Sequence, residues 1–141
     1  ESNGYYSDMT RVVAIKGRHL KKQLEIYDTV FNAQDRAIKA VEPGADAVNI
    51  DSAARYFIKG KGYNKYFGHG TGHGLGLAVH ERPVISWQSK ETIKKGMVFT
   101  VEPGIYLPGF GGVRIEDMVF VTGNGAEILT SLPRRLKIIE R

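Results

Sequence analysis

The chain has 141 residues, of which 42% are hydrophobic and 25% charged, values typical of one globular domain rather than a disordered or fibrous chain. A net charge of +5, without a basic block or a basic helix face, argues against a nucleic-acid-binding protein. Cysteine is absent, which excludes disulfide frameworks and thiolate sites, and no apolar run approaches the roughly 20 residues of a membrane span.

The first expected element is a strand over residues 5–15, because this segment is rich in aromatic and β-branched side chains. Strands disfavour Asp, so Asp8 stands out within it, although a charge on an edge strand would explain it equally well. Because the strand begins almost at residue 1, we expect that more of the protein precedes it.

Two helices are predicted next. Apolar residues at spacings of three, four and seven indicate an amphipathic helix from about His19 to Ala40, which Pro43 and Gly44 end. A second helix is expected from an N-cap at Asp46 to about Lys59. Its predicted apolar face consists of Val48, Ala53, Ala54 and Phe57.

The remaining chain is predicted to be β-rich. Short apolar runs indicate strands at residues 84–87, 97–101, 113–121 and 126–129, and the segment 123–125 indicates a hairpin between the last two. The tail from residue 133 is basic and weakly patterned. A strand, two helices and an antiparallel run together predict an α+β fold.

Glycine fills every second position from Gly68 to Gly76, a segment that also carries His69 and His73. This density argues against a helix, so we expect an extended strand or loop with room for a ligand beside the backbone. His80 follows, and three of the chain's 4 histidines thus lie close together. A glycine-rich turn with incidental histidines is the alternative, whereas the motifs of phosphate-binding loops do not occur.

Two glutamates accompany the predicted strands. Glu102 lies just after strand 97–101, where a lone Glu is usually a solvated side chain. Within 113–121, alternation places Arg114 and Glu116 on one face and Asp117 on the other. A charged Glu in a central strand is costly unless it is paired or binds a metal, so Glu116 is expected either to pair with Arg114 or to bind a cation.

Asp8, His73, Glu102 and Glu116 together form a set of three carboxylates and one imidazole, each in or beside an extended apolar segment. Such an oxygen-rich set suits Mn²⁺, Co²⁺ or Fe²⁺ better than a structural zinc ion. Carboxylates can also bridge two ions at roughly 3.5–4 Å, a separation suited to a shared hydroxide. The residue types therefore indicate a candidate metal centre and go no further.

Four motifs resemble the pita-bread metallopeptidases, which include Xaa-Pro aminopeptidase, Xaa-Pro dipeptidase and methionine aminopeptidase. They are Y-x-S-D-x-T-R, G-H-G-x-G-H-G-x-G-L-x-V-H-E-x-P, G-M-V-F-T-V-E-P-G-I-Y and G-V-R-I-E-D, between about Tyr5 and Pro133. The resemblance implies the C-terminal part of a pita-bread fold, with two helices on a curved, mainly antiparallel sheet. Residues 1–141 would then be a partial metallopeptidase catalytic domain.

The resemblance also implies two divalent metal ions, first of all Mn²⁺, with Co²⁺, Fe²⁺ or Zn²⁺ as alternatives. The family holds them with five residues, and the four positions that match are Asp8, His73, Glu102 and Glu116. The fifth, an Asp in a D-x-G pattern, is expected upstream of residue 1. The isolated piece could therefore bind only one metal ion or be inactive.

Further roles follow from the same resemblance. His69 and His80 match histidines that hydrogen-bond the substrate and the tetrahedral intermediate, and Glu102 could move a proton to the leaving nitrogen. Tyr106 and Arg114 match groups that orient the carboxylate ligands. The glycines at positions 70, 72 and 74 are expected to let substrate approach the backbone.

The V-R-I-E-D form of the last motif resembles the proline-directed branch, because methionine aminopeptidases usually carry an F-E-H-T-like sequence there. We expect an exopeptidase that cleaves the Xaa-Pro bond of short peptides with proline in second position, of the dipeptidase or aminopeptidase type. The alternatives are a metal-free peptide- or protein-binding module, a methionine aminopeptidase, and a structural domain in which Glu102 and Glu116 only pair with Arg114. A cytoplasmic protein that contacts neither nucleic acid nor membrane is expected, and the family is often dimeric.

Overall fold

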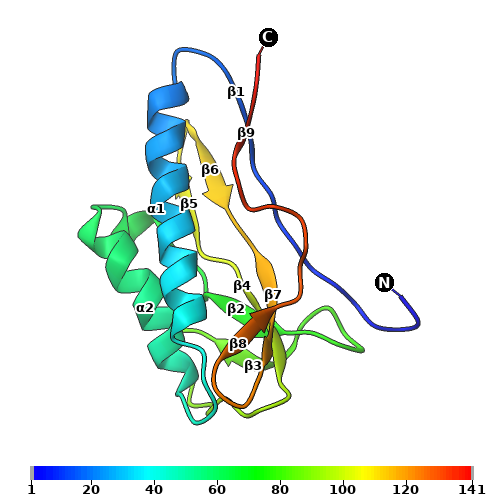
Figure 1. Ribbon diagram of the computed structural model, residues 1–141. Helices are drawn as coiled ribbons and strands as arrows, with labels where there is room; N and C mark the ends of the chain where they lie inside the picture. The colour runs from blue at the N-terminus through cyan, green and yellow to red at the C-terminus, as the bar shows by residue number, and fades with distance from the viewer. Residues whose placement is uncertain (1, 141) are drawn as a thin grey trace.

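The computed structural model describes residues 2–140 and shows two helices, α1 (Leu20–Lys39) and α2 (Ala47–Gly60), packed on one side of the strands (Figure 1). A short 3₁₀ turn, η1, spans Asn64–Tyr66. The strands are β1 (Val13–Ile15), β2 (Gly72–Gly74), β3 (Glu81–Ile85), β4 (Val98–Val101), β5 (Gly104–Leu107), β6 (Gly111–Arg114), β7 (Asp117–Val121), β8 (Ala126–Ile128) and β9 (Lys137–Ile139).

Both helices form within a residue or two of their predicted bounds, but the second differs in detail. Asp46 occupies the N-cap position without capping the helix, and its Oδ1 accepts a hydrogen bond from Thr92 Oγ1 at 3.3 Å instead. Of the predicted apolar face only Ala54 is fully buried, and the buried residues of α2 are Ala47, Ile50, Asp51, Ala54 and Ile58. The sequence did not predict this face, because the charged residue Asp51 interrupts its apolar positions.

Five strands form an antiparallel sheet in the order β3-β2-β4-β7-β8, and β5 pairs with β6 in a separate two-stranded sheet. The hairpin predicted between β7 and β8 is confirmed. The single strand predicted over residues 113–121 is wrong, since β6 and β7 belong to different sheets and the chain changes sheet at Ile115 and Glu116. Glu116 therefore lies between two strands, and its backbone forms only an isolated bridge with Thr10.

The N-terminal strand is much shorter than the predicted 5–15. Only β1 is regular, and it pairs in parallel with β9, a strand that the weak pattern of the tail did not predict. The chain before β1 is held by separate contacts: Thr10 forms an isolated bridge with Glu116, and the Tyr6 amide donates to the Gly76 carbonyl at 2.8 Å. Aromatic and β-branched composition gave the extended backbone correctly, but a strand also needs a neighbour along its length.

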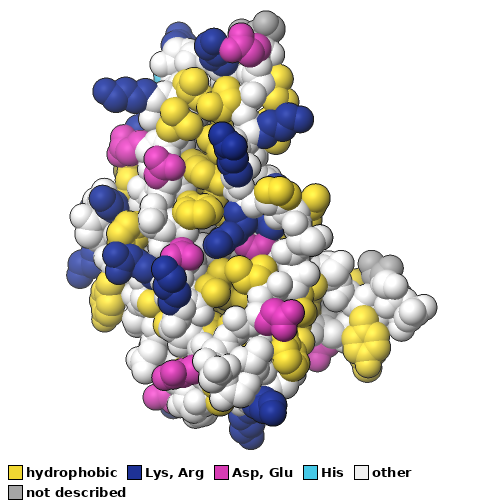
Figure 2. All heavy atoms as spheres, in the orientation of Figure 1, with side chains coloured by type: hydrophobic (Ala, Val, Ile, Leu, Met, Phe, Trp, Pro, Cys, Tyr) yellow, Lys and Arg dark blue, Asp and Glu magenta, His cyan; other side chains and the backbone are white. Residues whose placement is uncertain are grey.

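The core lies between the two helices and the five-stranded sheet, with side chains such as Ile26, Ile50 and Phe99 almost completely buried. Apolar side chains also gather on the surface over α1 and the C-terminal segment (Figure 2), where Phe31 and Leu136 line a groove of about 650 Å³. Within residues 2–140, neither helix is apolar enough over a sufficient length to cross a membrane.

Candidate metal centre

The structure brings the four predicted ligand residues together from four separate segments of the chain. Asp8, His73 and Glu116 each offer a donor atom, and these three atoms all lie within 4.8 Å of one another. Glu102 joins them through His73, with 3.1 Å between its Oε1 and the imidazole Nε2. Residues up to 108 positions apart in the sequence thus share one focus.

His73 is the middle residue of β2, and its glycine neighbours allow this strand to lie unusually close to others. A Cβ atom at Gly72 would come within 1.8 Å of the Thr100 carbonyl oxygen, and one at Gly74 within 2.1 Å of the Arg82 carbonyl oxygen. Our expectation that these glycines make room for substrate is therefore corrected: they make room for the backbone of β4 and β3.

Hydrogen bonds fix the orientation of the His73 ring. Its backbone amide donates to Thr100 Oγ1 at 3.0 Å, and the same hydroxyl donates to Glu102 Oε1 at 3.0 Å. The ring atom Nδ1 lies 3.1 Å from the Gly74 carbonyl oxygen. Because a carbonyl can only accept, Nδ1 carries the proton and Nε2 faces the cluster with its lone pair free for a ligand whenever the ring is neutral.

Glu116 is 2% exposed and is approached mainly by other acids. Burial is the largest cause that raises its pKa, and the carboxylates of Glu102 and Asp8 raise it further, against the hydrogen bond from Thr10. That bond joins Thr10 Oγ1 to Glu116 Oε2 at 2.5 Å. A buried acid surrounded by like charges favours either a proton or a cation.

Within residues 2–140, His73 and Glu102 form the one ion pair of the cluster, and the Arg114 guanidinium adds positive charge nearby without a direct ion pair. The hydrogen bond that His73 donates to Glu102 raises the pKa of His73, while burial lowers it by less. Burial raises the pKa of Glu102, but its contacts with His73 and Thr100 outweigh this and leave it below the ordinary value. With all three carboxylates ionised, one imidazolium and the nearby Arg114 guanidinium would still leave the cluster one negative charge in excess.

Arg114 and Tyr106 lie beside the cluster, but the predicted direct ion pair between Arg114 and Glu116 is absent from the described residues. Arg114 Nε donates instead to Thr10 Oγ1 at 3.2 Å, so a threonine stands between the two charges. Burial lowers the pKa of Arg114, and nearby Tyr106, Glu102 and Glu116 raise it by more.

The two other histidines occupy different surroundings. The ring of His80 is exposed and its centroid lies 4.1 Å from that of His73. His69 has its Nδ1 2.7 Å from the Gly70 carbonyl oxygen and its ring 5.6 Å from that of Tyr106. Its Nε2 is buried and has no hydrogen-bond partner within residues 2–140, the state expected of a polar atom that a bound molecule would satisfy.

One supporting pair escaped the sequence prediction. Arg55 forms two hydrogen bonds with the buried Asp51, at 2.7 and 2.9 Å, and donates to the backbone carbonyls of Phe67 and His69 at 3.0 and 2.8 Å. Asp51 also accepts from Thr71 Oγ1 at 2.8 Å. The pair thereby holds the segment that carries His69, and its spacing of four residues on a predicted helix was the available signal.

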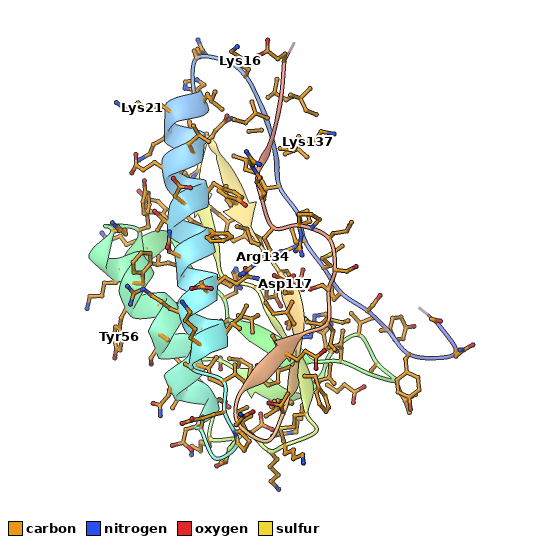
Figure 3. All side chains as sticks on the ribbon, viewed as in Figure 1. Lys16, Lys21, Tyr56, Asp117, Arg134 and Lys137 are labelled. Atoms are coloured by element: carbon orange, nitrogen blue, oxygen red, sulfur yellow. The ribbon has the colours of Figure 1, made fainter. Side chains whose placement is uncertain are left out.

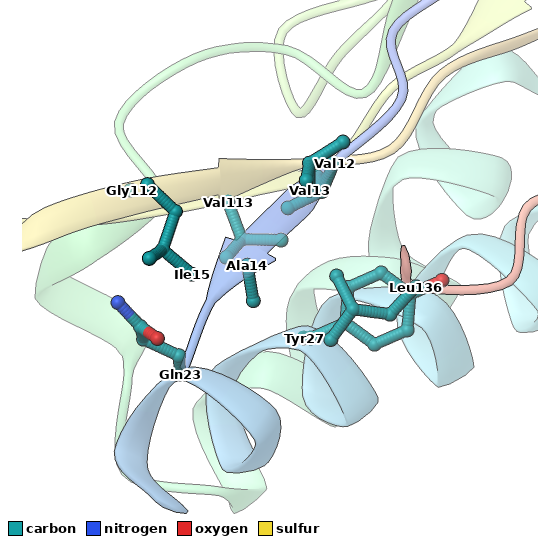
Figure 4. A pocket seen from close by; sticks show the side chains of 9 residues that line it. All are labelled: Val12, Val13, Ala14, Ile15, Gln23, Tyr27, Gly112, Val113 and Leu136. Atoms are coloured by element: carbon teal, nitrogen blue, oxygen red, sulfur yellow. The ribbon is translucent and has the colours of Figure 1, made fainter. Parts of the chain in front are cut away.

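A pocket lies apart from the cluster. It has a volume of about 240 Å³ and opens between β1, β6 and α1 (Figure 4), where Val12, Gln23 and Val113 are among its lining residues. None of its lining residues belongs to the cluster. The candidate site is therefore defined by its donor atoms and not by this cavity.

Comparison with known proteins agrees with this geometry. The model of metallopeptidase family M24 matches residues 1–123, and the chain belongs to that family. It is 52% identical to the Xaa-Pro dipeptidase of Pyrococcus furiosus over 95% of this chain and 38% of that protein. The chain thus spans about 38% of the length of this curated relative.

Solved structures show the same fold. A dipeptidase from Pyrococcus horikoshii is 47% identical with a TM-score of 0.93, and an X-Pro aminopeptidase from Thermotoga maritima is 46% identical with a TM-score of 0.89. Each match covers 96% of this chain and 38% of the other. A methionine aminopeptidase from Rickettsia prowazekii is more distant, at 26% identity and a TM-score of 0.75 over 89% of this chain and 59% of the other. The predicted α+β, pita-bread fold is confirmed.

Proposed function

We propose that this chain is the metal-binding part of a longer, dinuclear metallopeptidase that hydrolyses the Xaa-Pro bond of short peptides. The observation that carries the proposal is the convergence of Asp8, His73 and Glu116 within 4.8 Å, with Glu102 on the imidazole. The proline-directed names of the similar Xaa-Pro dipeptidase and of the X-Pro aminopeptidase support the substrate class.

The donor set fits divalent metal ions. Three carboxylates and one neutral imidazole offer hard oxygen ligands with a single nitrogen, which suits Mn²⁺ first and Co²⁺, Fe²⁺ or Zn²⁺ as alternatives. The pKa of Glu116 is raised chiefly by burial and further by the carboxylates of Glu102 and Asp8, so a cation bound beside it would favour its ionised form. Bound divalent ions would supply a water of lowered pKa and a Lewis acid for the carbonyl before proline.

The remaining predicted residues act on the substrate. His69 Nε2, buried and unpartnered within the described chain, donates to or accepts from the bound peptide, and the exposed His80 beside His73 donates to charge that develops on the carbonyl oxygen. Glu102, whose pKa is lowered by its neighbours, accepts a proton and delivers it to the leaving proline nitrogen. Arg114 and Tyr106 steady this arrangement beside the acids.

A metal-free binding module of the same fold is the competing proposal. It is disfavoured because every ligand position that this chain can offer retains a ligating side chain at the common focus. A purely structural role for Glu102 and Glu116 is disfavoured by the contacts of Arg114, which pass through Thr10. The cytoplasmic location and the homodimer stay predictions.

The test uses the full-length protein, purified in chelator and reconstituted with Mn²⁺. We expect about two Mn²⁺ per chain by elemental analysis, and metal-dependent hydrolysis of an Xaa-Pro dipeptide or of a longer peptide with proline in second position. The ratio of these two rates separates the dipeptidase from the aminopeptidase type. Cleavage of Met-Ala peptides in preference to both, or peptide binding without Mn²⁺ uptake, would overturn the proposal.

A further inference from the structure

Asp117 follows Glu116 in the chain but faces the opposite side, toward α1, in a polar network whose two central side chains are fully buried. Its carboxylate accepts hydrogen bonds from Arg11 Nη2 at 2.6 Å, from Gln34 Nε2 at 2.9 Å and from Thr130 Oγ1. Figure 3 shows Asp117 beside Arg134, whose Nε lies 3.8 Å from Asp117 Oδ2. Asp117 and Gln34 are both 0% exposed.

The donors around Asp117 also hold the backbone of three segments that carry predicted ligands. Arg11 Nη1 donates to the carbonyl oxygens of Thr10 at 3.0 Å and of Glu116 at 2.7 Å. Gln34 Nε2 donates to the carbonyl oxygen of Val101 at 3.0 Å. These carbonyls lie two residues after Asp8, on Glu116 itself and one residue before Glu102. The network thus contacts every ligand-bearing segment except β2.

For the N-terminal segment this link adds to the contacts of Tyr6 and Thr10, because Asp8 does not lie in a paired strand. The backbone amide of Asp8 has a single described partner, Met118 Sδ at 3.3 Å. Arg11 ties the same segment to Glu116 and Asp117. It also ties the segment to the C-terminal part of the chain through the carbonyl oxygen of Leu132, at 3.0 Å from Nε and 2.7 Å from Nη2.

We propose that Asp117, Arg11 and Gln34 are positioning residues that set the spacing of the metal ligands from the far side of the sheet. This inference rests on the proposed function. A buried carboxylate saturated with donors is rigid, because each of its bonds is strong in a water-free interior and costly to lose. Rigid support of this kind controls metal affinity without any contact with the ions.

The test uses the full-length protein with Asp117→Asn and Arg11→Lys, and with Tyr63→Phe as the matched control. Arg11→Lys keeps the positive charge beside Asp117, so the variant is expected to fold. Its ammonium group cannot bridge several carbonyl oxygens, so the variant tests the hydrogen-bond geometry separately from the charge. Tyr63 is also buried, and its hydroxyl bonds only Lys22 and Glu25. Its loss weakens the fold without touching a ligand-bearing segment.

Mn²⁺ affinity is measured by titration calorimetry, and Co²⁺ geometry by visible absorption, with melting temperature as the fold control. We expect roughly 10- to 100-fold weaker Mn²⁺ binding and an altered Co²⁺ spectrum in both Asp117→Asn and Arg11→Lys, and wild-type values in Tyr63→Phe. Wild-type affinity and an unchanged spectrum in a folded Arg11→Lys protein would overturn the inference alone. A wild-type protein that takes up no Mn²⁺ would overturn the proposed function with it.

Discussion

Glu116 and Asp117 are adjacent in the chain, and both are buried, yet their surroundings are opposite. Asp117 accepts hydrogen bonds from one guanidinium, one amide and one hydroxyl, and a second arginine lies nearby. Glu116 accepts from one hydroxyl, and the nearby carboxylates of Glu102 and Asp8 each affect its pKa more than the Arg114 guanidinium does. The strand alternation that separates the two residues thus separates a completed polar network from an incomplete one.

This difference distinguishes a structural carboxylate from one placed for a ligand. Burial of a charge is tolerated when donors around it replace the lost water, which is the case for Asp117. Around Glu116 such donors are too few, so its ionised form keeps a desolvation cost. Binding of a proton or a cation would remove that cost. The comparison therefore predicts that the same loss of charge has different consequences at the two positions.

The largest effect on activity is expected from a substitution in the candidate metal centre. His73→Ala in the full-length protein removes the only imidazole at the focus, and metal-dependent Xaa-Pro hydrolysis is expected to fall by about 10³-fold or more. His19→Ala is the control, since His19 lies at the start of α1, outside the cluster. Hydrolysis at the wild-type rate in His73→Ala would defeat the assignment of the cluster as the reaction centre.

The second prediction compares the two acids directly in the metal-free, full-length protein. Asp117→Asn leaves the Arg11 guanidinium without its buried partner and is expected to cost about 3–5 kcal/mol in the free energy of unfolding. Glu116→Gln removes a charge that other acids repel and should leave this free energy unchanged or slightly raised. Urea unfolding measures both. Equal losses in the two variants would show that Glu116 is as well compensated as Asp117.

The third prediction concerns the strand that delivers His73. Gly72→Ala places a Cβ atom 1.8 Å from the Thr100 carbonyl oxygen, so β2 must move away from β4, at a cost of about 1–3 kcal/mol or more. Gly68→Ala is the matched control, because its Cβ would meet nothing within 4 Å. Urea unfolding should separate the two variants. If both lose the same stability, close strand packing does not explain the glycine pattern.

The sequence predicted both helices and the hairpin, because helix periodicity and turn signals are local. The four residues that meet at the focus were predicted from the motifs that contain them. The sequence could not predict that β6 and β7 part at Ile115, since the run 113–121 contains neither glycine nor proline to mark a break and only tertiary pairing divides it. Nor did it single out Asp117 as a network centre, because its donors Arg11, Gln34 and Thr130 lie far along the chain. The role of the four residues as ligands stays a prediction.

The smallest expected effect is the pH dependence of the metal-free protein. The pKa of His73 is raised from its ordinary 6.5 chiefly by the hydrogen bond with Glu102, so the charged pair stabilises the fold below that pKa and is lost as pH rises through it. The pKa of Glu102 is lowered, so its contribution is lost again as pH falls through the lowered value. Because both side chains are partly solvated, the change in the free energy of unfolding should be about 0.2–1 kcal/mol.

Melting of the metal-free protein between about pH 5 and 9 should show the alkaline loss of stability, and His73→Gln should remove it. An undiminished alkaline loss in His73→Gln would assign it to a group outside the cluster.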